Sequence, residues 1–300
     1  MPGIVVYALG GNALSSPTRP SDEETALVLA KVMSDVVDLL ESGWKVVLTH
    51  GNGPQVGHLM SLDNSQSMDS WVAATQGMIG HDLSINLDSI LRKRGRPEKT
   101  AVLLTRVEID SNDKGLEFPT KPVGPVLSDS DAMSLDWDIA ETTSGPRRVV
   151  ASPIPREIID IEVIKALVGA GAIVICGGGG GIPILRLEDH FRGIPAVVDK
   201  DRFSALLAIE LEAEALIIST AIDSLKLNFN TPSEQTLTSI SLEDAYSNLE
   251  SGQFPVGSMG PKVASLCDVV EKLPKTKAIL CQPGDAIKAL RGQAGTRIVS

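Results

Sequence analysis

The stretch IVVYALGGN at residues 4–12 joins six apolar residues to a glycine pair and an asparagine. Such a run is typical of a buried strand that ends in a tight loop. Residues 21–43 then predict a helix, because a capping box opens the segment, apolar residues recur within it at helical spacing and a glycine closes it. Residues 44–49 predict a second buried strand. The opening of the chain therefore predicts the strand, helix, strand unit of a parallel sheet.

The same alternation continues through most of the chain. It predicts an α/β fold in which an open, mostly parallel sheet is sandwiched by helices. Further strands are expected at residues 100–104, 172–176, 215–218, 278–280 and 296–299, and further helices at 161–168, 202–212, 242–249 and 263–273.

Residues 111–155 interrupt this alternation. The segment contains six prolines and many Asp, Ser and Thr residues, with little periodicity. A loop of about 45 residues without secondary structure is uncommon inside a compact domain. We therefore expect a small inserted lobe that carries a few strands of its own and can move against the body.

The composition restricts the class of protein. A content of 43% hydrophobic but only 3% aromatic residues fits a globular core of Val, Ile, Leu and Ala. A formal net charge of −11 argues against nucleic acid or an anionic membrane as a partner, because both require clustered Lys and Arg. The three cysteines include no CxxC pair, so neither a disulfide framework nor a zinc site is indicated. With no leader-like start and no long apolar stretch, we expect a cytoplasmic protein.

Four glycine-rich loops follow the apolar runs. In open parallel sheets, ligands bind beyond the carboxyl ends of the strands, where these loops are expected. Glycine lets the backbone approach a ligand closely, and Pro54 and Pro261 are well placed to begin helices whose free N–H groups attract oxyanions. Each loop taken singly could equally be a tight turn, but four together predict anion-binding loops. They are residues 10–13, 50–57, 177–181 and 257–262.

Two common nucleotide-binding fingerprints are absent from the sequence. No GxxxxGK[ST] motif occurs, and the glycines at 51, 53 and 57 are spaced GxGxxxG rather than GxGxxG. The sequence therefore supports neither a P-loop fold nor a Rossmann dehydrogenase.

Three lysines supply the positive charge that these loops lack. Lys121 lies in the proline-rich segment, Lys200 stands between two aspartates, and Lys262 follows a Gly-Ser-Met-Gly-Pro turn. A single lysine is usually a solvated surface residue. Phosphoryl transfer, however, needs charge stabilisation and positioning rather than a covalent nucleophile, so lysines and backbone amides can suffice.

Taken together, these motifs resemble those of carbamate kinases within the amino-acid kinase superfamily. They occur in the family's order and span nearly the whole chain. They are ALGGNAL at 8–14, THGNGPQVG at 49–57, TQGMIG at 75–80, PTKPVGP at 119–125, VVDKD at 197–201 and GSMGPK at 257–262.

The resemblance implies a single domain over residues 1–300 with an open sheet of about eight strands, and a homodimer. Within the domain, residues 1–110 and 156–195 would form the substrate side and 196–300 the nucleotide side, with the lobe at 111–155 over the substrate. The implied reaction is reversible phosphoryl transfer between ATP and carbamate. Mg²⁺ would be held mainly by the nucleotide, and no general base is needed because carbamate is already an anion.

The resemblance also assigns roles to residues. Lys121 would reach over the substrate, Lys200 and Lys262 would bind the nucleotide phosphates and stabilise the transition state, and Asp201 would hold the lysines in place. Substrate would be held by Gly10, Gly11, Asn12, Gly51, Asn52 and Gly53. The nucleotide would also contact Asp223, Gly257, Ser258 and Met259.

Four features depart from the family pattern, one of them the glycine run at 177–181, which is five residues long rather than four. Ala151 stands where proline is usual, Ile154 where lysine is usual, and His81 where tyrosine is usual. Two alternatives stay open, and the lost positive charge at residue 154 favours the first of them. One is a kinase of another small acid or phosphate, and the other is a non-catalytic regulator that binds a nucleotide or carbamoyl phosphate.

Overall fold

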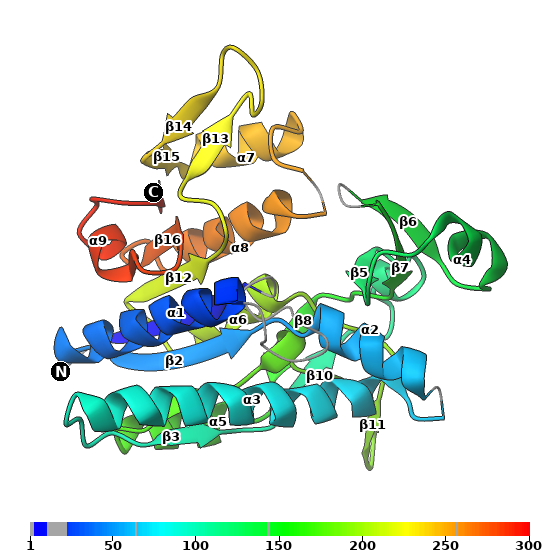
Figure 1. Ribbon diagram of the computed structural model, residues 1–300, viewed down its shortest axis with the longest axis horizontal. Helices are drawn as coiled ribbons and strands as arrows, with labels where there is room; N and C mark the ends of the chain where they lie inside the picture. The colour runs from blue at the N-terminus through cyan, green and yellow to red at the C-terminus, as the bar shows by residue number, and fades with distance from the viewer. Residues whose placement is uncertain (1–2, 11–22, 64, 143–144, 256) are drawn as a thin grey trace.

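The central sheet has eight strands and is parallel over most of its width. The computed structural model describes residues 3–10, 23–63, 65–142, 145–255 and 257–300 (Figure 1). The strand order is β15-β17-β16-β12-β1-β2-β9-β3. Only β16 and β17 pair antiparallel, so β15 and β17 run against the other strands at one edge. The strands are β1 (Ile4–Leu9), β2 (Lys45–His50), β3 (Thr100–Val102), β9 (Ile173–Ile175), β12 (Ala215–Ser219), β15 (Ser239–Ser241), β16 (Lys277–Cys281) and β17 (Thr296–Val299).

Helices cover both faces of this sheet, as predicted. Along β1, Val6 and Ala8 point into one apolar cluster, while Val5 and Leu9 point into another on the opposite face. This alternation follows from the two-residue period of a strand. The first cluster is covered by α5 (Ile161–Gly169), α6 (Lys200–Glu210), α7 (Leu242–Glu250) and α8 (Met259–Lys272), and the second by α1 (Glu23–Glu41), α3 (Met68–Lys93) and α9 (Ala286–Leu290).

The first predicted helix, α1, ends as the sequence indicates. Gly43 has a φ of +87°, in the left-handed region that favours glycine, and its N–H donates to the carbonyl of Leu40 at 3.0 Å. Ser21 of the predicted capping box lies outside the described residues. No helix within the described residues is both long and apolar enough to cross a bilayer.

Two smaller sheets extend the body beyond the expected strands. A four-stranded sheet has the order β11-β10-β4-β8, and β13 pairs with β14 in a hairpin. Their bounds are β4 (Arg106–Ile109), β8 (Pro155–Ile158), β10 (Ile182–Arg186), β11 (Phe191–Gly193), β13 (Leu225–Leu227) and β14 (Gln235–Leu237).

The segment that breaks the alternation forms a separate three-stranded antiparallel sheet in the order β5-β7-β6. Figure 1 shows these strands and α4 together in green at one side of the molecule. Backbone hydrogen bonds join this lobe to the body, from Gly124 N to Gly53 O at 3.1 Å and from Val197 N to Ala151 O at 3.0 Å. Its elements are η2 (Lys114–Leu116), β5 (Lys121–Val123), α4 (Asp129–Ser134), β6 (Ile139–Thr142) and β7 (Gly145–Val150).

Candidate functional site

Three central strands end at the same level of the sheet. Leu9 at the end of β1 is in register with His50 of β2 and with Ser219 of β12. The next residues are hydrogen-bonded to these ends, since Gly10 N donates to Ser219 O at 2.9 Å and Gly51 N donates to Leu9 O at 3.3 Å. The first two predicted loops therefore lie side by side. Gly11 and Asn12, assigned to the substrate from sequence, lie outside the described residues.

The start of α6 brings two of the predicted lysines onto one carboxylate. Lys200 pairs with Oδ1 of Asp201, and Lys262 Nζ lies 2.9 Å from its Oδ2. Lys262 comes from the first turn of α8, which packs against α6. The exposed fractions of Lys200 and Asp201 are only 6% and 2%. Each carboxylate oxygen of Asp201 thus binds one lysine. Lys200 is its neighbour in the sequence, and Lys262 is 61 residues away.

A second carboxylate receives the lobe lysine. Lys121, the first residue of β5, pairs with Oδ2 of Asp199. The other oxygen of Asp199 accepts the N–H groups of Asp201 at 2.9 Å and Arg202 at 3.3 Å, which caps α6. Lys121, Lys200 and Lys262 therefore meet in one charge cluster, although they come from three separate parts of the sequence.

Burial and opposite charge act against each other in this cluster. Burial raises the pKa of Asp199 and Asp201, but the neighbouring lysines outweigh it, so both carboxyl pKa values lie below the usual range. Burial lowers the pKa of Lys200 despite the Asp201 carboxylate. Burial also acts to lower the pKa of Lys262, but Asp201 more than offsets it and the pKa is raised. We conclude that both aspartates are ionised.

The glycine run at 177–181 is buried and closely packed against neighbouring side chains. A Cβ on Gly178 would lie 2.4 Å from the His50 ring, and one on Gly179 would lie 2.1 Å from Asn52 Nδ2. Internal acceptors take several N–H groups, because Gly177 donates to Thr105 Oγ1 at 3.0 Å and residues 180 and 181 donate within the loop. Gly177, Gly180 and Gly181 thus have internal acceptors, and an anion-binding role for this loop stays a prediction.

Asn52 and Gly53 stand at the start of α2 (Gly53–Leu62). Asn52 is the N-cap residue, is 1% exposed and donates from Nδ2 to Thr75 Oγ1 at 2.9 Å. Thr75 in turn donates to Val72 O at 2.8 Å, which fixes the orientation of the Asn52 amide. The asparagine is thus held rigidly beside the glycine run.

Buried polar residues that the sequence did not single out hold this framework together. Gln76 bonds both to the backbone of Thr105 and to Gly178 O, the latter at 2.9 Å. Thr49 and Ser204 lie 2.6 Å apart through their hydroxyls, and Ser204 donates to Lys200 O at 2.6 Å. The only sequence signal was their place in or beside the glycine-rich and lysine-bearing motifs.

Apart from Lys200 and Lys262, the residues assigned to the nucleotide lie in two segments, in which Asp223, Gly257 and Ser258 are exposed and Met259 is half-buried. Ser258 is the N-cap of α8 and Met259 its first residue, and Gly257 precedes them on the surface. Asp223 lies on the exposed segment that follows β12. Within the described ranges, no hydrogen bond or ion pair joins Asp223 to Lys200 or Lys262.

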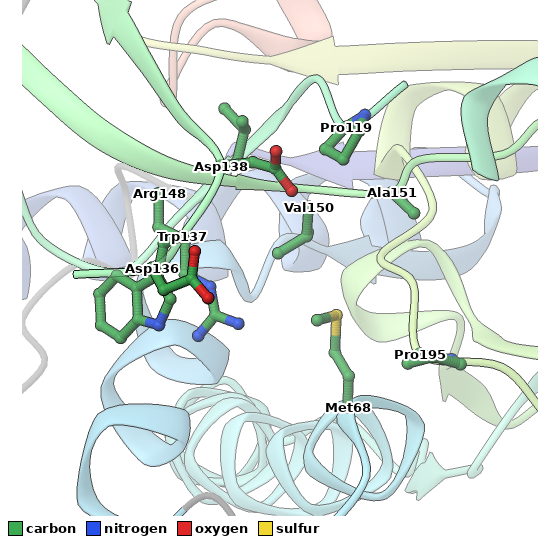
Figure 2. A pocket seen from close by; sticks show the side chains of 10 residues that line it. Met68, Pro119, Asp136, Trp137, Asp138, Arg148, Val150, Ala151 and Pro195 are labelled. Carbon is green, nitrogen blue, oxygen red and sulfur yellow. The ribbon is translucent and has the colours of Figure 1, made fainter. Parts of the chain in front are cut away.

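A pocket of about 250 Å³ lies between the lobe and the body and is lined by residues of both. Figure 2 shows Trp137, Arg148 and Val150 of the lobe facing Met68 and Pro195 of the body. The Arg148 guanidinium lies 4.5 Å from the centroid of the Trp137 ring. The lysine cluster does not line this pocket.

The cluster has the chemistry needed to stabilise a phosphoryl group. Three ammonium groups face two carboxylates, which leaves one net positive charge at the carboxyl edge of the sheet. Fixed charges in a buried site stabilise the equatorial oxygens of a transferring phosphoryl group without reorganisation. Lys200 and Lys262 both sit at helix starts, whose partial positive charge adds to this effect.

Comparisons with known proteins agree with this chemistry. The profile of the amino acid kinase family matches residues 3–280. A carbamate kinase of Clostridium perfringens is 40% identical, with 98% of this chain and 99% of the relative covered. The carbamate kinase-like protein YqeA of Escherichia coli is also 40% identical, with 98% of each covered. The structure of Giardia lamblia carbamate kinase bound to AMP-PNP matches with a TM-score of 0.86 and 33% identity, covering 99% of this chain and 98% of that one.

Proposed function

The chain belongs to the amino acid kinase family, and from that premise we propose that it is a carbamate kinase, which transfers a phosphoryl group reversibly between ATP and carbamate. The products in the forward direction are ADP and carbamoyl phosphate. One observation carries the proposal beyond family membership: Lys121, Lys200 and Lys262 converge on two buried carboxylates at the ligand-binding edge of the sheet.

The residues divide the work of the reaction. A carbamate oxygen attacks the γ-phosphorus directly, and no general base is needed because carbamate is an anion. Lys200 and Lys262 stabilise the equatorial oxygens and the developing charge on the leaving ADP. Lys121 covers the reacting group from the lobe, and Asp201 holds the other two lysines at a fixed distance. Gly10, Gly51, Asn52 and Gly53, together with Gly11 and Asn12, provide the substrate side.

We propose that Mg²⁺ enters with the nucleotide. Within the described ranges, no group of three His, Cys, Asp or Glu residues could hold a metal ion. Asp199 and Asp201 are already engaged by lysines. This donor set fits Mg²⁺ that keeps the phosphate oxygens as its main ligands, as is common for nucleotide-bound magnesium. When bound, Mg²⁺ neutralises phosphate charge.

A kinase of another small acid is the second candidate. Ile154 has an exposed fraction of 53% and directly precedes β8, at the position where the motif resemblance implies a lysine. Its N–H is fixed by Asp113 Oδ2 at 2.7 Å. An apolar group there would weaken the attraction for an anionic acceptor, so substrate profiling with carbamoyl phosphate and other acyl phosphates separates the candidates.

We further propose a homodimer in the cytoplasm, with a lobe over residues 111–155 that moves against the rest of a single domain. The exposed apolar residues Met78 and Ile85 on α3, at 54% and 52%, support a subunit contact. The lobe's separate sheet and the pocket beneath it support its motion.

The first experiment measures ATP formation from ADP, Mg²⁺ and carbamoyl phosphate. We expect turnover by the wild type, and a kcat about 100- to 1,000-fold lower in Lys200→Ala and Lys262→Ala, because each removes a charge that stabilises the transition state. Lys165→Ala is the matched control, since this lysine pairs with Glu162 on the exposed face of α5. Tight nucleotide binding without turnover would reject the kinase assignment and favour a regulator.

A further inference from the structure

We propose that Asp199 is a positioning residue that fixes Lys121 of the lobe over the reacting phosphoryl group. The proposal rests on the proposed function and adds a residue to it. Asp199 holds Lys121 with one carboxylate oxygen and caps α6 with the other. It therefore connects the lobe to the helix that begins with Lys200.

The cluster uses two carboxylates, and each of its three lysines pairs with one of them. Asp201 uses Oδ1 for Lys200 and Oδ2 for Lys262. Both oxygens of Asp201 are engaged, and among the described residues the ion pair of Lys121 is with Asp199 instead. Asp199 supplies the missing acceptor two residues earlier, at the same helix start.

The Lys121–Asp199 pair is also distinctive as a link between lobe and body. Among the ion pairs of the described residues, it alone joins residues 111–155 to the rest of the chain. The described residues also link the lobe to the body through backbone hydrogen bonds and a small apolar cluster that includes Val56, Val123 and Val150. Those contacts hold the lobe against the body, whereas the ion pair with Asp199 fixes the ammonium group of Lys121.

Both partners suit a lasting electrostatic contact. The Asp199 side chain is 12% exposed and that of Lys121 is 28% exposed, so solvent screens the pair only in part. Burial acts to raise the pKa of Asp199, but the charge of Lys121 outweighs it and keeps the carboxylate ionised. An ammonium group held in this way is oriented before substrate arrives, which lowers the cost of ordering it during the reaction.

The test separates the two tasks of Asp199. Asparagine caps helices about as well as aspartate, so Asp199→Asn keeps the α6 cap and removes the charge that holds Lys121. We expect its kcat/KM for carbamoyl phosphate to fall about 10- to 100-fold, the usual range for a charge-assisted contact. The KM for ADP should remain within about twofold, because Lys200 and Lys262 keep their partner.

A double-mutant cycle shows whether Asp199 acts through Lys121. In a Lys121→Met background, Asp199→Asn should cost no more than about twofold, since the lysine it positions is gone. An equal loss in both backgrounds would overturn the proposal and place the effect on α6 and Lys200. Asp160→Asn is the control, because Asp160 also precedes a helix and pairs with Arg106, and neither residue belongs to the lobe.

Hydrogen exchange distinguishes a failure of this inference from a failure of the proposed function. If the wild type forms no ATP from carbamoyl phosphate, the function fails, whatever the variants do. Exchange of the β5 and β7 amides should still accelerate equally in Asp199→Asn, Lys121→Met and the double variant. Unchanged exchange in Asp199→Asn would show that the carboxylate does not hold the lobe, and would overturn the inference by itself.

Discussion

His50 shows how strongly single residues near the site are constrained. Its side chain is 1% exposed, and its Nδ1 lies 3.1 Å from Gly51 O. Burial, aided by the charge of Lys200, lowers the pKa of His50 from 6.5 to about 4. The imidazole is therefore neutral in the folded protein at neutral pH and cannot compete with the lysines for an anionic ligand.

This burial predicts a specific dependence of stability on pH. Between about pH 6.5 and 4 the unfolded state binds a proton at His50 that the folded state excludes, so the free energy of unfolding should fall as the pH falls, by up to about 3 kcal/mol. Urea unfolding of wild type and His50→Gln across this range measures the effect, and the variant should show a flatter profile. Asp199 and Asp201 have lowered carboxyl pKa values, so their contribution to stability is lost only as the pH falls below about 4. Their effect therefore lies below the pH range of the His50 effect.

The exposed His81 is the matched control for that measurement. His81→Gln should keep the slope of the wild type. If His50→Gln also keeps it, the histidine is not the group that titrates, and its burial does not govern acid stability.

The limits of sequence prediction are clear for the charged residues. Lys200, Asp201 and Lys262 stand in short motifs at helix starts, so local patterns were enough to single them out. Lys121 and Asp199 are 78 residues apart in the sequence, and their contact depends on how the lobe packs against the start of α6. A local sequence pattern cannot predict such a contact. Gln76 and Ser204 were missed for the same reason, because their value lies in buried contacts with distant loops.

At the scale of elements, α2 and the lobe touch through two glycines. An added Cβ on Gly57 would lie 2.0 Å from Gly124 N and 2.1 Å from Gly124 Cα. These are backbone atoms, which cannot turn aside as a side chain can. The approach of the lobe to α2 thus depends on the absence of a side chain at residue 57.

Gly57→Ala should displace the lobe. We expect a loss of about 1–3 kcal/mol in stability from overpacking, together with a lower kcat/KM for carbamoyl phosphate because Lys121 moves with β5. Thermal unfolding and steady-state kinetics measure the two effects. Gly77→Ala in α3 is the matched control, since a Cβ there meets nothing within 4 Å and should stabilise the helix by up to about 1 kcal/mol. Equal behaviour of both variants would contradict a tight glycine contact.

The elements that were predicted and those that were missed differ in how they are stabilised. Helices such as α1 and α5 have an apolar stripe that packs against the sheet, and the central strands are continuous apolar runs. Both patterns are visible in the sequence, so these elements could be predicted from it. The 26-residue helix α3 carries buried residues such as Thr75 and Gln76 among its apolar ones, which blurs its period. Strands of three or four residues in the smaller sheets are held by pairing with distant segments rather than by a local pattern.

At the scale of the whole molecule, the two apolar clusters share the same strands. Val6 and Val5 are neighbours on β1 but belong to opposite clusters. One cluster cannot come apart without exposing strands that support the other. The two faces of the sheet should therefore unfold together.

The buried cysteines report on the two faces separately. Cys267 lies in the cluster under α8, and Cys281 in the cluster under α1. Burial raises the pKa of both thiols, to about 12 for Cys267, so neither should react in the folded protein. Thiol labelling against urea, in variants that keep one cysteine each, should give coincident midpoints. Separate midpoints would mean that the faces unfold independently.

The central position of β1 has a consequence for synthesis on the ribosome. This strand pairs with β2 on one side and, through Val5 and Ala215, with β12 on the other. At about 5–20 residues per second, roughly 10–40 s pass between the emergence of the first strand and that of its second partner. During this interval the nascent chain carries an apolar strand with an open edge, which is a template for wrong pairing and a site for chaperone binding.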